Sequence, residues 1–172
     1  MPVAGLIFFS AQQTGALWSD TGNLDGGTIT AGTLEIGVGA DGSTSSAFTL
    51  DGFGKTGLLE EGYSQKPLTV KNSGNVPMQY RLTGVSQTNP TLPMTLKVWR
   101  VASEAACSAT GDPAAGTVVY SGNMIGASVA AWETVQPNAS EVLCLRGTVA
   151  TGAGPGVSSK ATFTFAARQV QV

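Results

Sequence analysis

The chain has 172 residues, of which 12% are charged and 42% are hydrophobic, and its formal net charge is −2. This length fits one domain, and the hydrophobic content is too high for a disordered chain. A nucleic-acid-binding protein would carry a basic patch, which this sequence lacks. There is no histidine, which excludes His-dependent catalytic triads and His-based zinc sites.

The remaining polar residues give no pattern of a catalytic or metal centre. The acidic residues do not cluster as a calcium loop requires. Glu60 and Glu61 are adjacent, but neighbouring side chains on a strand point to opposite faces, so we interpret this pair as part of a solvated turn. No Ser or Cys stands beside a plausible base. We therefore expect a protein without enzymatic activity, cofactor or metal.

Residues 1–16 form an apolar N-terminal segment, which we separate from a domain spanning residues 17–172. The stretch Val3 to Phe9 is uncharged and β-prone, but it lacks a basic leader and is too short for a complete signal peptide. One interpretation is a signal remnant with cleavage near Ala16. The other is a strand that seeks the open sheet edge of a partner, or that folds back onto its own domain.

Strand-like alternation recurs along the rest of the chain, separated by Gly-, Pro- and Asn-rich turns. Gly26-Gly27 predicts a hairpin turn, followed by an alternating run from Thr28 to Val38. After a turn over residues 57–67, we expect strands at 67–82 (with a bend at 72–75), 94–101, 117–120, 141–149 and 160–172. Residues 128–132 fit either a strand or a turn of helix.

Two of these strands carry informative faces. In residues 94–101, Leu96 and Val98 share one face and Trp99 the other. In residues 141–149, Cys144 and Arg146 share a face opposite to the leucines. With about eight to ten short strands and no amphipathic helix, the sequence predicts an all-β, two-sheet antiparallel sandwich.

The two cysteines, Cys107 and Cys144, predict one disulfide if the protein is exported. Closing a loop of this length would stabilise the fold by about 4 kcal/mol in the chain-entropy model. The alternative is two buried free thiols in a cytosolic protein.

Several phrases of the chain resemble the TasA/camelysin family of exported β-sandwich proteins. They are spread over nearly the whole chain: WSD at 18–20, TITAGTLEI at 28–36, TVKNSGNVPMQYRL at 69–82, LCLRGTV at 143–149 and ATFTFAA at 161–167. The resemblance implies a jelly-roll-like sandwich with an extended N-terminal strand. Camelysin has been classed as a metalloprotease, but without His or HExxH this sequence gives no basis for carrying that activity over.

The resemblance implies a secreted, cell-surface subunit of a fibre that forms by head-to-tail donation of the N-terminal strand to the next copy. Its partners would be further copies of itself, minor fibre subunits or cell-surface components, with neither nucleic acid nor a transmembrane segment involved. The expected donor residues are Val3, Leu6, Ile7, Phe8, Phe9, Ala11, Leu17 and Trp18, with Leu6, Phe8 and Ala11 facing inward. Cleavage near Ala16 would move the donor to residues 17–24.

A second hypothesis is a monomeric, secreted surface- or glycan-binding module. Its stacking platform would use Trp18, Trp99 and Trp132. Scattered tryptophans in a sandwich are more often packing residues, so the fibre hypothesis comes first.

Overall fold

The computed structural model describes residues 22–24, 27–29, 36–40, 43–45, 58–154 and 156–170. The chain divides into two compact units, Met1–Gly32 and Thr33–Val172. In the first, β1 (Gly22–Leu24) pairs antiparallel with β2 (Gly27–Ile29). Gly27 already belongs to β2, where it is the partner of Leu24, so it is a strand residue and not part of the predicted Gly26-Gly27 turn.

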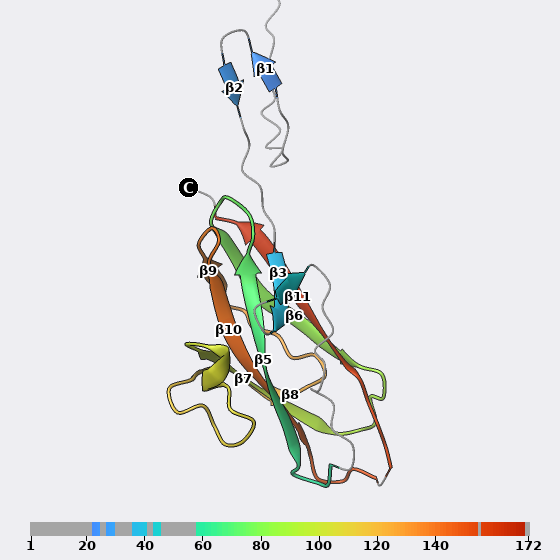
Figure 1. Cartoon of the computed structure of the whole chain (residues 1–172). Coiled ribbons are helices and arrows are strands. Elements are labelled where there is room, and N and C mark those ends of the chain that lie inside the picture. Colours follow the sequence, from blue (N-terminus) through green and yellow to red (C-terminus); the bar gives the residue numbers. More distant parts are fainter. Residues whose placement is uncertain are drawn as a thin grey trace, which may run out of the picture. The chain divides into compact units, whose positions relative to one another are not determined.

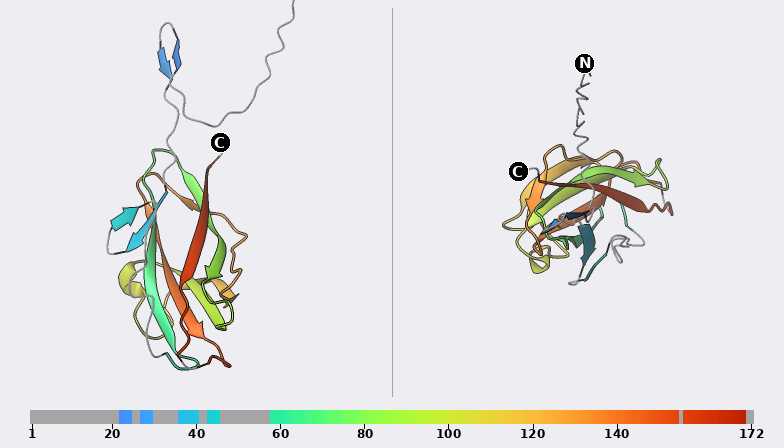
Figure 2. Two further views of the ribbon diagram at one scale, coloured as in Figure 1. Left: turned by 90° about the vertical axis from the view of Figure 1, so that its right-hand side faces the viewer. Right: turned by 90° about the horizontal axis from the view of Figure 1, so that it is seen from above.

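The second unit is an all-β sandwich of two antiparallel sheets, which confirms the predicted fold class (Figures 1 and 2). One sheet has the order β4-β3-β5-β10-β7-β8 and the other β11-β6-β9. The strands are β3 (Ile36–Ala40), β4 (Ser43–Ser45), β5 (Tyr63–Asn72), β6 (Met78–Gln87), β7 (Met94–Val101), β8 (Thr117–Asn123), β9 (Glu133–Val135), β10 (Ser140–Val149) and β11 (Ala161–Gln169).

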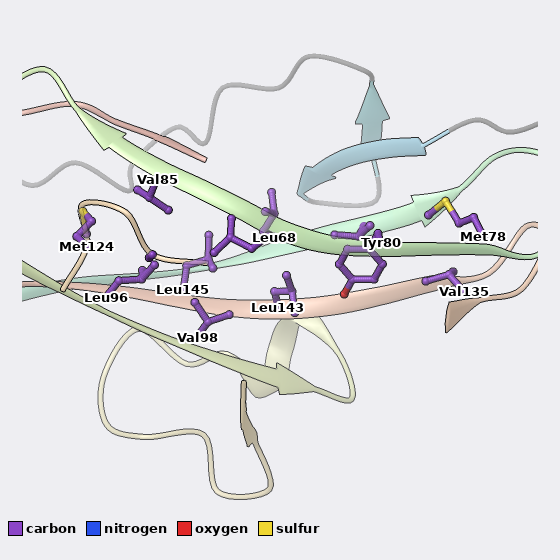
Figure 3. Close-up of a cluster of buried hydrophobic side chains, with 13 residues drawn as sticks. Leu68, Met78, Tyr80, Val85, Leu96, Val98, Met124, Val135, Leu143 and Leu145 are labelled. Carbon is purple, nitrogen blue, oxygen red and sulfur yellow. The ribbon is translucent and has the colours of Figure 1, made fainter. Parts of the chain in front are cut away.

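The main core lies between the two sheets and collects apolar side chains from strands of both (Figure 3). The period-2 alternation of the sequence explains its membership, because side chains two apart point to the same face. The predicted faces of β7 and β10 are confirmed. The buried members are Leu68, Val70, Met78, Tyr80, Leu82, Val85, Leu96, Val98, Met124, Ala127, Val135, Leu143 and Leu145.

A bulge in β6 keeps this strand's apolar residues in the core. Met78, Tyr80 and Leu82 are buried at every second position, but the next buried residue is Val85. The pairing with β11 skips Thr83, because Gly84 lies opposite Thr164 and Leu82 opposite Phe165. The extra residue shifts the alternation by one, which returns Val85 to the interior.

β5 begins earlier than predicted, at Tyr63, so residues 63–67 are strand and not turn. Pro67 lies inside this strand although proline cannot donate to a ladder. Asn72 N–H donates to the Ala139 carbonyl, so the even-numbered residues of β5 direct their backbone groups toward β10. Pro67 is odd-numbered and lies opposite Cys144, so its backbone points away from β10. The described pairing with β3 begins only at Thr69, so Pro67 interrupts no described ladder bond.

The other sequence-based expectations have mixed outcomes. β7 coincides with the predicted strand, and Glu60 and Glu61 lie in a turn as expected. Residues 128–132 form neither a strand nor a helix; this segment runs beside β6, where Val129 N–H donates to the Leu82 carbonyl. A short 3₁₀ turn, η1 (Glu104–Ala106), precedes Cys107 and was not predicted.

The bend between β5 and β6 depends on the side chain of Asn72, which is fully buried. Its Nδ2 donates to the carbonyls of Val76 (2.8 Å) and Val135 (3.0 Å), and its Oδ1 accepts from Gly74 N–H. Asn72 therefore connects the bend to β9, and it satisfies backbone groups that would be costly to bury unpaired. This is the structural role of the KNSGN phrase.

Candidate assembly site

Cys107 and Cys144 form a disulfide, as the cysteine pair predicts for an exported protein. Their Sγ atoms are bonded and their Cα atoms lie 5.3 Å apart. Cys144 lies in the middle of β10 and points to the outer face of the six-stranded sheet, where it packs with Trp99 and Val101. The disulfide therefore fixes a long loop against this face. We call residues 102–116 the cysteine loop.

Polar contacts hold the cysteine loop along β5 and β10. Gln65 Nε2 donates to the carbonyls of Ser108 (2.6 Å) and Gly111 (3.1 Å), and Thr69 Oγ1 donates to Glu104 Oε1 (2.5 Å). At Gly116 the loop approaches the sheet closely, since a Cβ there would lie 3.1 Å from Cδ1 of Trp99. This face of the sheet is thus covered by the chain's own loop (Figure 1, yellow).

Arg146 is the centre of a cation–aromatic cluster beneath the cysteine loop. Its guanidinium carbon lies 4.4 Å from the ring centroid of Tyr63 and 4.8 Å from that of Trp99. Its Nη1 also pairs with Asp112 at 2.6 Å, and Lys97 pairs with the same carboxylate at 2.9 Å. Hydrogen bonds from Lys97 and then Arg146 hold the pKa of Asp112 below its usual value. The charged side chains of this cluster, Arg146, Lys97 and Asp112, are therefore paired with one another.

A second polar cluster closes one end of the sandwich. Arg100 on β7 pairs with Glu133 on β9, and its Nε lies 3.4 Å from Glu141 Oε1 on β10. Burial raises the pKa of Glu141 and of Tyr80, whose hydroxyl faces this cluster. The neighbouring cavity has a volume of about 30 Å³. This space suits a water molecule. The ion pair of Arg100 with Glu133 joins the two sheets.

The open strand edges are the features through which this fold can make a new contact. Among the described strands of the sandwich, β4, β8, β9 and β11 each have one neighbour. β4 and β9 have three residues each, and β8 carries a register shift near its centre. β11 is the longest of the four at nine residues, and Arg168 is its only charged residue. An edge of this length with little charge favours addition of a further strand.

The backbone of β11 presents alternate residues to this edge. Thr88 N–H donates to the Lys160 carbonyl, and Val170 N–H donates to the Pro77 carbonyl, so the even-numbered residues point their backbone groups toward β6. The odd-numbered residues therefore direct N–H and C=O away from β6. They are Ala161, Phe163, Phe165, Ala167 and Gln169. This edge is the candidate acceptor site.

The expected strand-donor residues, Val3, Leu6, Ile7, Phe8, Phe9, Ala11, Leu17 and Trp18, lie outside the described residues, as does the expected boundary after residue 16. Of the other tryptophans, Trp99 is only 2% exposed and packs in the core beside the disulfide. Trp132 is half-buried, lies just before β9 and outside any strand, and contacts two arginines. Sequence reasoning missed this arrangement because the arginines come from distant strands.

Two classes of site are not found in the described part of the chain. It holds no group of three or more His, Cys, Asp or Glu side chains placed to bind a metal. It also contains no helix whose length and apolar character would let it cross a membrane.

No family model matches the chain, and no curated protein matches it.

Proposed function

We propose that the chain is a structural subunit of an extracellular bacterial fibre, assembled when the N-terminal segment of one copy adds as a strand to β11 of the next. The observation that carries this proposal is the open edge of β11, which has β6 as its one described neighbour. Such a head-to-tail contact joins different surfaces of two identical subunits, so it propagates into a filament instead of closing a dimer.

The proposed donor matches the acceptor in length and chemistry. Residues 3–11, VAGLIFFSA, are as long as β11 and carry no charge and no proline. Added beside β11, they would pair with the backbone groups of its odd-numbered residues, and their alternate apolar side chains would extend the core layer. Main-chain pairing of this kind supplies affinity, and side-chain fit supplies specificity.

Three further observations support the proposal. The Cys107–Cys144 disulfide suits an oxidising, extracellular environment. The charged clusters around Arg146 and Arg100 are internally paired and serve the fold, which supports a non-catalytic role. The phrases shared with the TasA/camelysin family run through β5, β6, β10 and β11, and members of that family build fibres.

A monomeric glycan-binding module is the competing function, and Trp132 is the residue that favours it. A sugar ring would stack on an exposed indole face. Here Trp99 is buried and Trp132 already contacts Arg81 and Arg168, so the described tryptophans form no continuous platform. The open strand edge therefore supports polymerisation better.

The acceptor edge can be tested with proline, which removes one backbone donor. Ala167→Pro removes an N–H that points away from β6, so the β6–β11 pairing keeps its hydrogen bonds. We expect filament elongation, followed by light scattering and negative-stain electron microscopy, to slow about tenfold, because a ladder bond of the incoming strand is lost and the ring obstructs its approach.

Ser121→Pro is the matched control on β8, the edge of the other sheet. Met124 N–H donates to the Met94 carbonyl, and this register directs the Ser121 backbone away from β7. We expect this variant to elongate like the wild type. Equal elongation of both variants would place the acceptor elsewhere, and a wild-type chain that stays monomeric at high concentration would contradict the fibre.

A further inference from the structure

Three side chains stack on the outer face of the three-stranded sheet. The guanidinium carbons of Arg81 on β6 and Arg168 on β11 lie 4.5 Å and 4.1 Å from the ring centroid of Trp132. The register places Ala166 opposite Arg81 and Gln79 opposite Arg168, so the two arginines are diagonal neighbours on one face. We call Arg81, Trp132 and Arg168 the arginine–tryptophan ladder.

The positive charge of the ladder has no compensation within the described residues. The ion pairs there involve Lys97, Arg100 and Arg146, and none includes Arg81 or Arg168. Arg81 Nη1 donates to the Ala130 carbonyl at 3.4 Å and Arg168 Nε donates to Gln79 Oε1 at 3.0 Å, which are neutral acceptors. Arg81 Nε is buried and has no hydrogen-bond partner in the described part of the chain.

Two guanidinium groups held this close repel each other, and the aromatic ring offsets that repulsion only in part. An anionic group that approaches both would relieve the repulsion and form charge-assisted, fork-shaped hydrogen bonds, for which carboxylates have the right geometry. The chemistry of the ladder therefore selects a carboxylate-bearing partner.

The chain itself contains such a partner, because its charges are unevenly distributed. All nine Lys and Arg residues follow residue 54, whereas five of the eleven acidic residues precede it: Asp20, Asp25, Glu35, Asp41 and Asp51. Asp20 and Asp25 belong to the N-terminal unit, Met1–Gly32, which carries no basic side chain. A negative N-terminal unit and an unpaired positive patch on the sandwich are complementary.

We propose that the arginine–tryptophan ladder docks the N-terminal unit of a second copy of this chain, through the carboxylates of Asp20 and Asp25. This inference rests on the proposed fibre and deepens it. Arg168 lies in β11, the proposed acceptor, so a donor strand added there lies beside the ladder. Asp20 follows the donor residue Ala11 closely enough for the chain to reach the ladder, at about 3.3 Å per extended residue. Strand addition then supplies affinity, and the ladder fixes the register.

The test is a charge exchange in the full chain. Arg81→Glu/Arg168→Glu and Asp20→Arg/Asp25→Arg each place like charges at the contact, and the fourfold variant restores opposite charges. We expect each double variant to raise the critical concentration for filament formation about tenfold or more, and the fourfold variant to recover most of that loss. Lys66→Glu/Lys71→Glu on β5, in the other sheet, is the control for overall charge, and we expect it to resemble the wild type.

Folding of each variant is checked by its thermal unfolding, with Arg81→Gln/Arg168→Gln as the milder form. If the arginine variants assemble like the wild type, the ladder is not the docking site, although the fibre stands. If both double variants have a raised critical concentration and the fourfold variant does not lower it again, the proposed pairing is wrong.

A second readout does not depend on filaments. The side-chain Nε signals of Arg81 and Arg168 in the ¹⁵N-labelled full chain are followed by NMR during titration with a peptide of residues 17–31, and separately with alginate, a carboxylated polysaccharide. Shifts with the peptide, lost at high salt, support docking even if the wild type proves monomeric and the fibre fails. Shifts with alginate alone overturn the inference in favour of a polyanion-binding face, and no shift with either probe also overturns it.

Discussion

At the residue scale, Tyr80 is the most unusual buried polar group. Its side chain is 2% exposed and lies in the main core, and its hydroxyl makes no hydrogen bond of ordinary geometry in the described part of the chain. Burial, followed by the nearby charge of Glu141, raises its pKa well above the usual value of 10.0. An unsatisfied hydroxyl costs stability, so the ring and not the hydroxyl is what the core requires.

The pH dependence of stability follows from this raised pKa. In the unfolded chain Tyr80 loses its proton near pH 10, whereas in the folded chain it keeps the proton to higher pH. Above pH 10 the unfolded state therefore binds fewer protons, and the stability of the fold decreases as pH rises, by up to about 1.4 kcal/mol per pH unit. Below pH 10 both states are protonated and Tyr80 contributes no pH dependence.

We predict that Tyr80→Phe leaves the protein as stable as the wild type at pH 7, or more stable by about 1 kcal/mol, because it removes a buried hydroxyl without a partner. The variant should also lose most of the decrease in stability above pH 10. Urea unfolding at pH 7 and at pH 10.5 measures both effects. Tyr120→Phe is the control, since its hydroxyl donates to the Asn123 carbonyl. A variant that is clearly less stable at pH 7 would show that the hydroxyl has a partner.

At the element scale, β10 and the cysteine loop depend on each other. β10 has neighbours on both sides and packs on both faces: its leucines fill the main core, and Cys144 packs beneath the loop with Trp99. This explains the consecutive buried residues Leu143, Cys144 and Leu145, which an exposed sheet face would not produce. The loop therefore acts as a cover for the six-stranded sheet.

We predict that reducing the disulfide lowers the free energy of unfolding by about 4 kcal/mol, because the unfolded chain regains the entropy of the closed loop. Urea unfolding with and without a reductant measures this difference. Cys107→Ala/Cys144→Ala is the companion variant, and it should match the reduced wild type and be insensitive to reductant. The contacts of Gln65 and Arg146 with the loop remain, so we expect both forms to stay folded. An unchanged unfolding midpoint would contradict the cross-link.

At the scale of the whole molecule, the N-terminal unit is acidic and begins with a segment, residues 1–16, that has no charged side chain. All the basic residues lie in the unit that contains the sandwich. The sandwich has its own core and its own cross-link, so assembly through the N-terminal segment does not require the sandwich to refold. In the proposed fibre, polymerisation would require only the addition of one segment to one edge, and the charge distribution would orient successive copies.

We predict that the full chain forms filaments and that a chain lacking residues 1–16 remains monomeric, because the truncation removes the apolar donor strand. Negative-stain electron microscopy of the two purified proteins distinguishes these states. Filaments from both would keep the fibre and move the donor to residue 17 and beyond. Monodisperse particles from both, at high concentration, would contradict polymerisation and favour the binding-module function.

The sequence alone determined the class of fold, the position of β7, the faces of β7 and β10, and the cysteine pair. These properties are local. Side chains two residues apart in a strand point to the same face, and turns are marked by Gly, Pro and Asn. Local rules failed where a distant contact decides the outcome. Pro67 is tolerated inside β5 because its backbone faces away from β10, and the bulge at Thr83 moves Val85 into the core.

Only the tertiary structure decided which strands are edges and which side chains from distant strands meet. Alternation shows the two faces of a strand but not its neighbours, because pairing is set by the packing of the whole sandwich. β11 is an edge while the similar strand β10 is central, and Arg81, Trp132 and Arg168 meet only because β6, β9 and β11 form one sheet. The candidate acceptor edge and the ladder beside it are therefore products of non-local pairing.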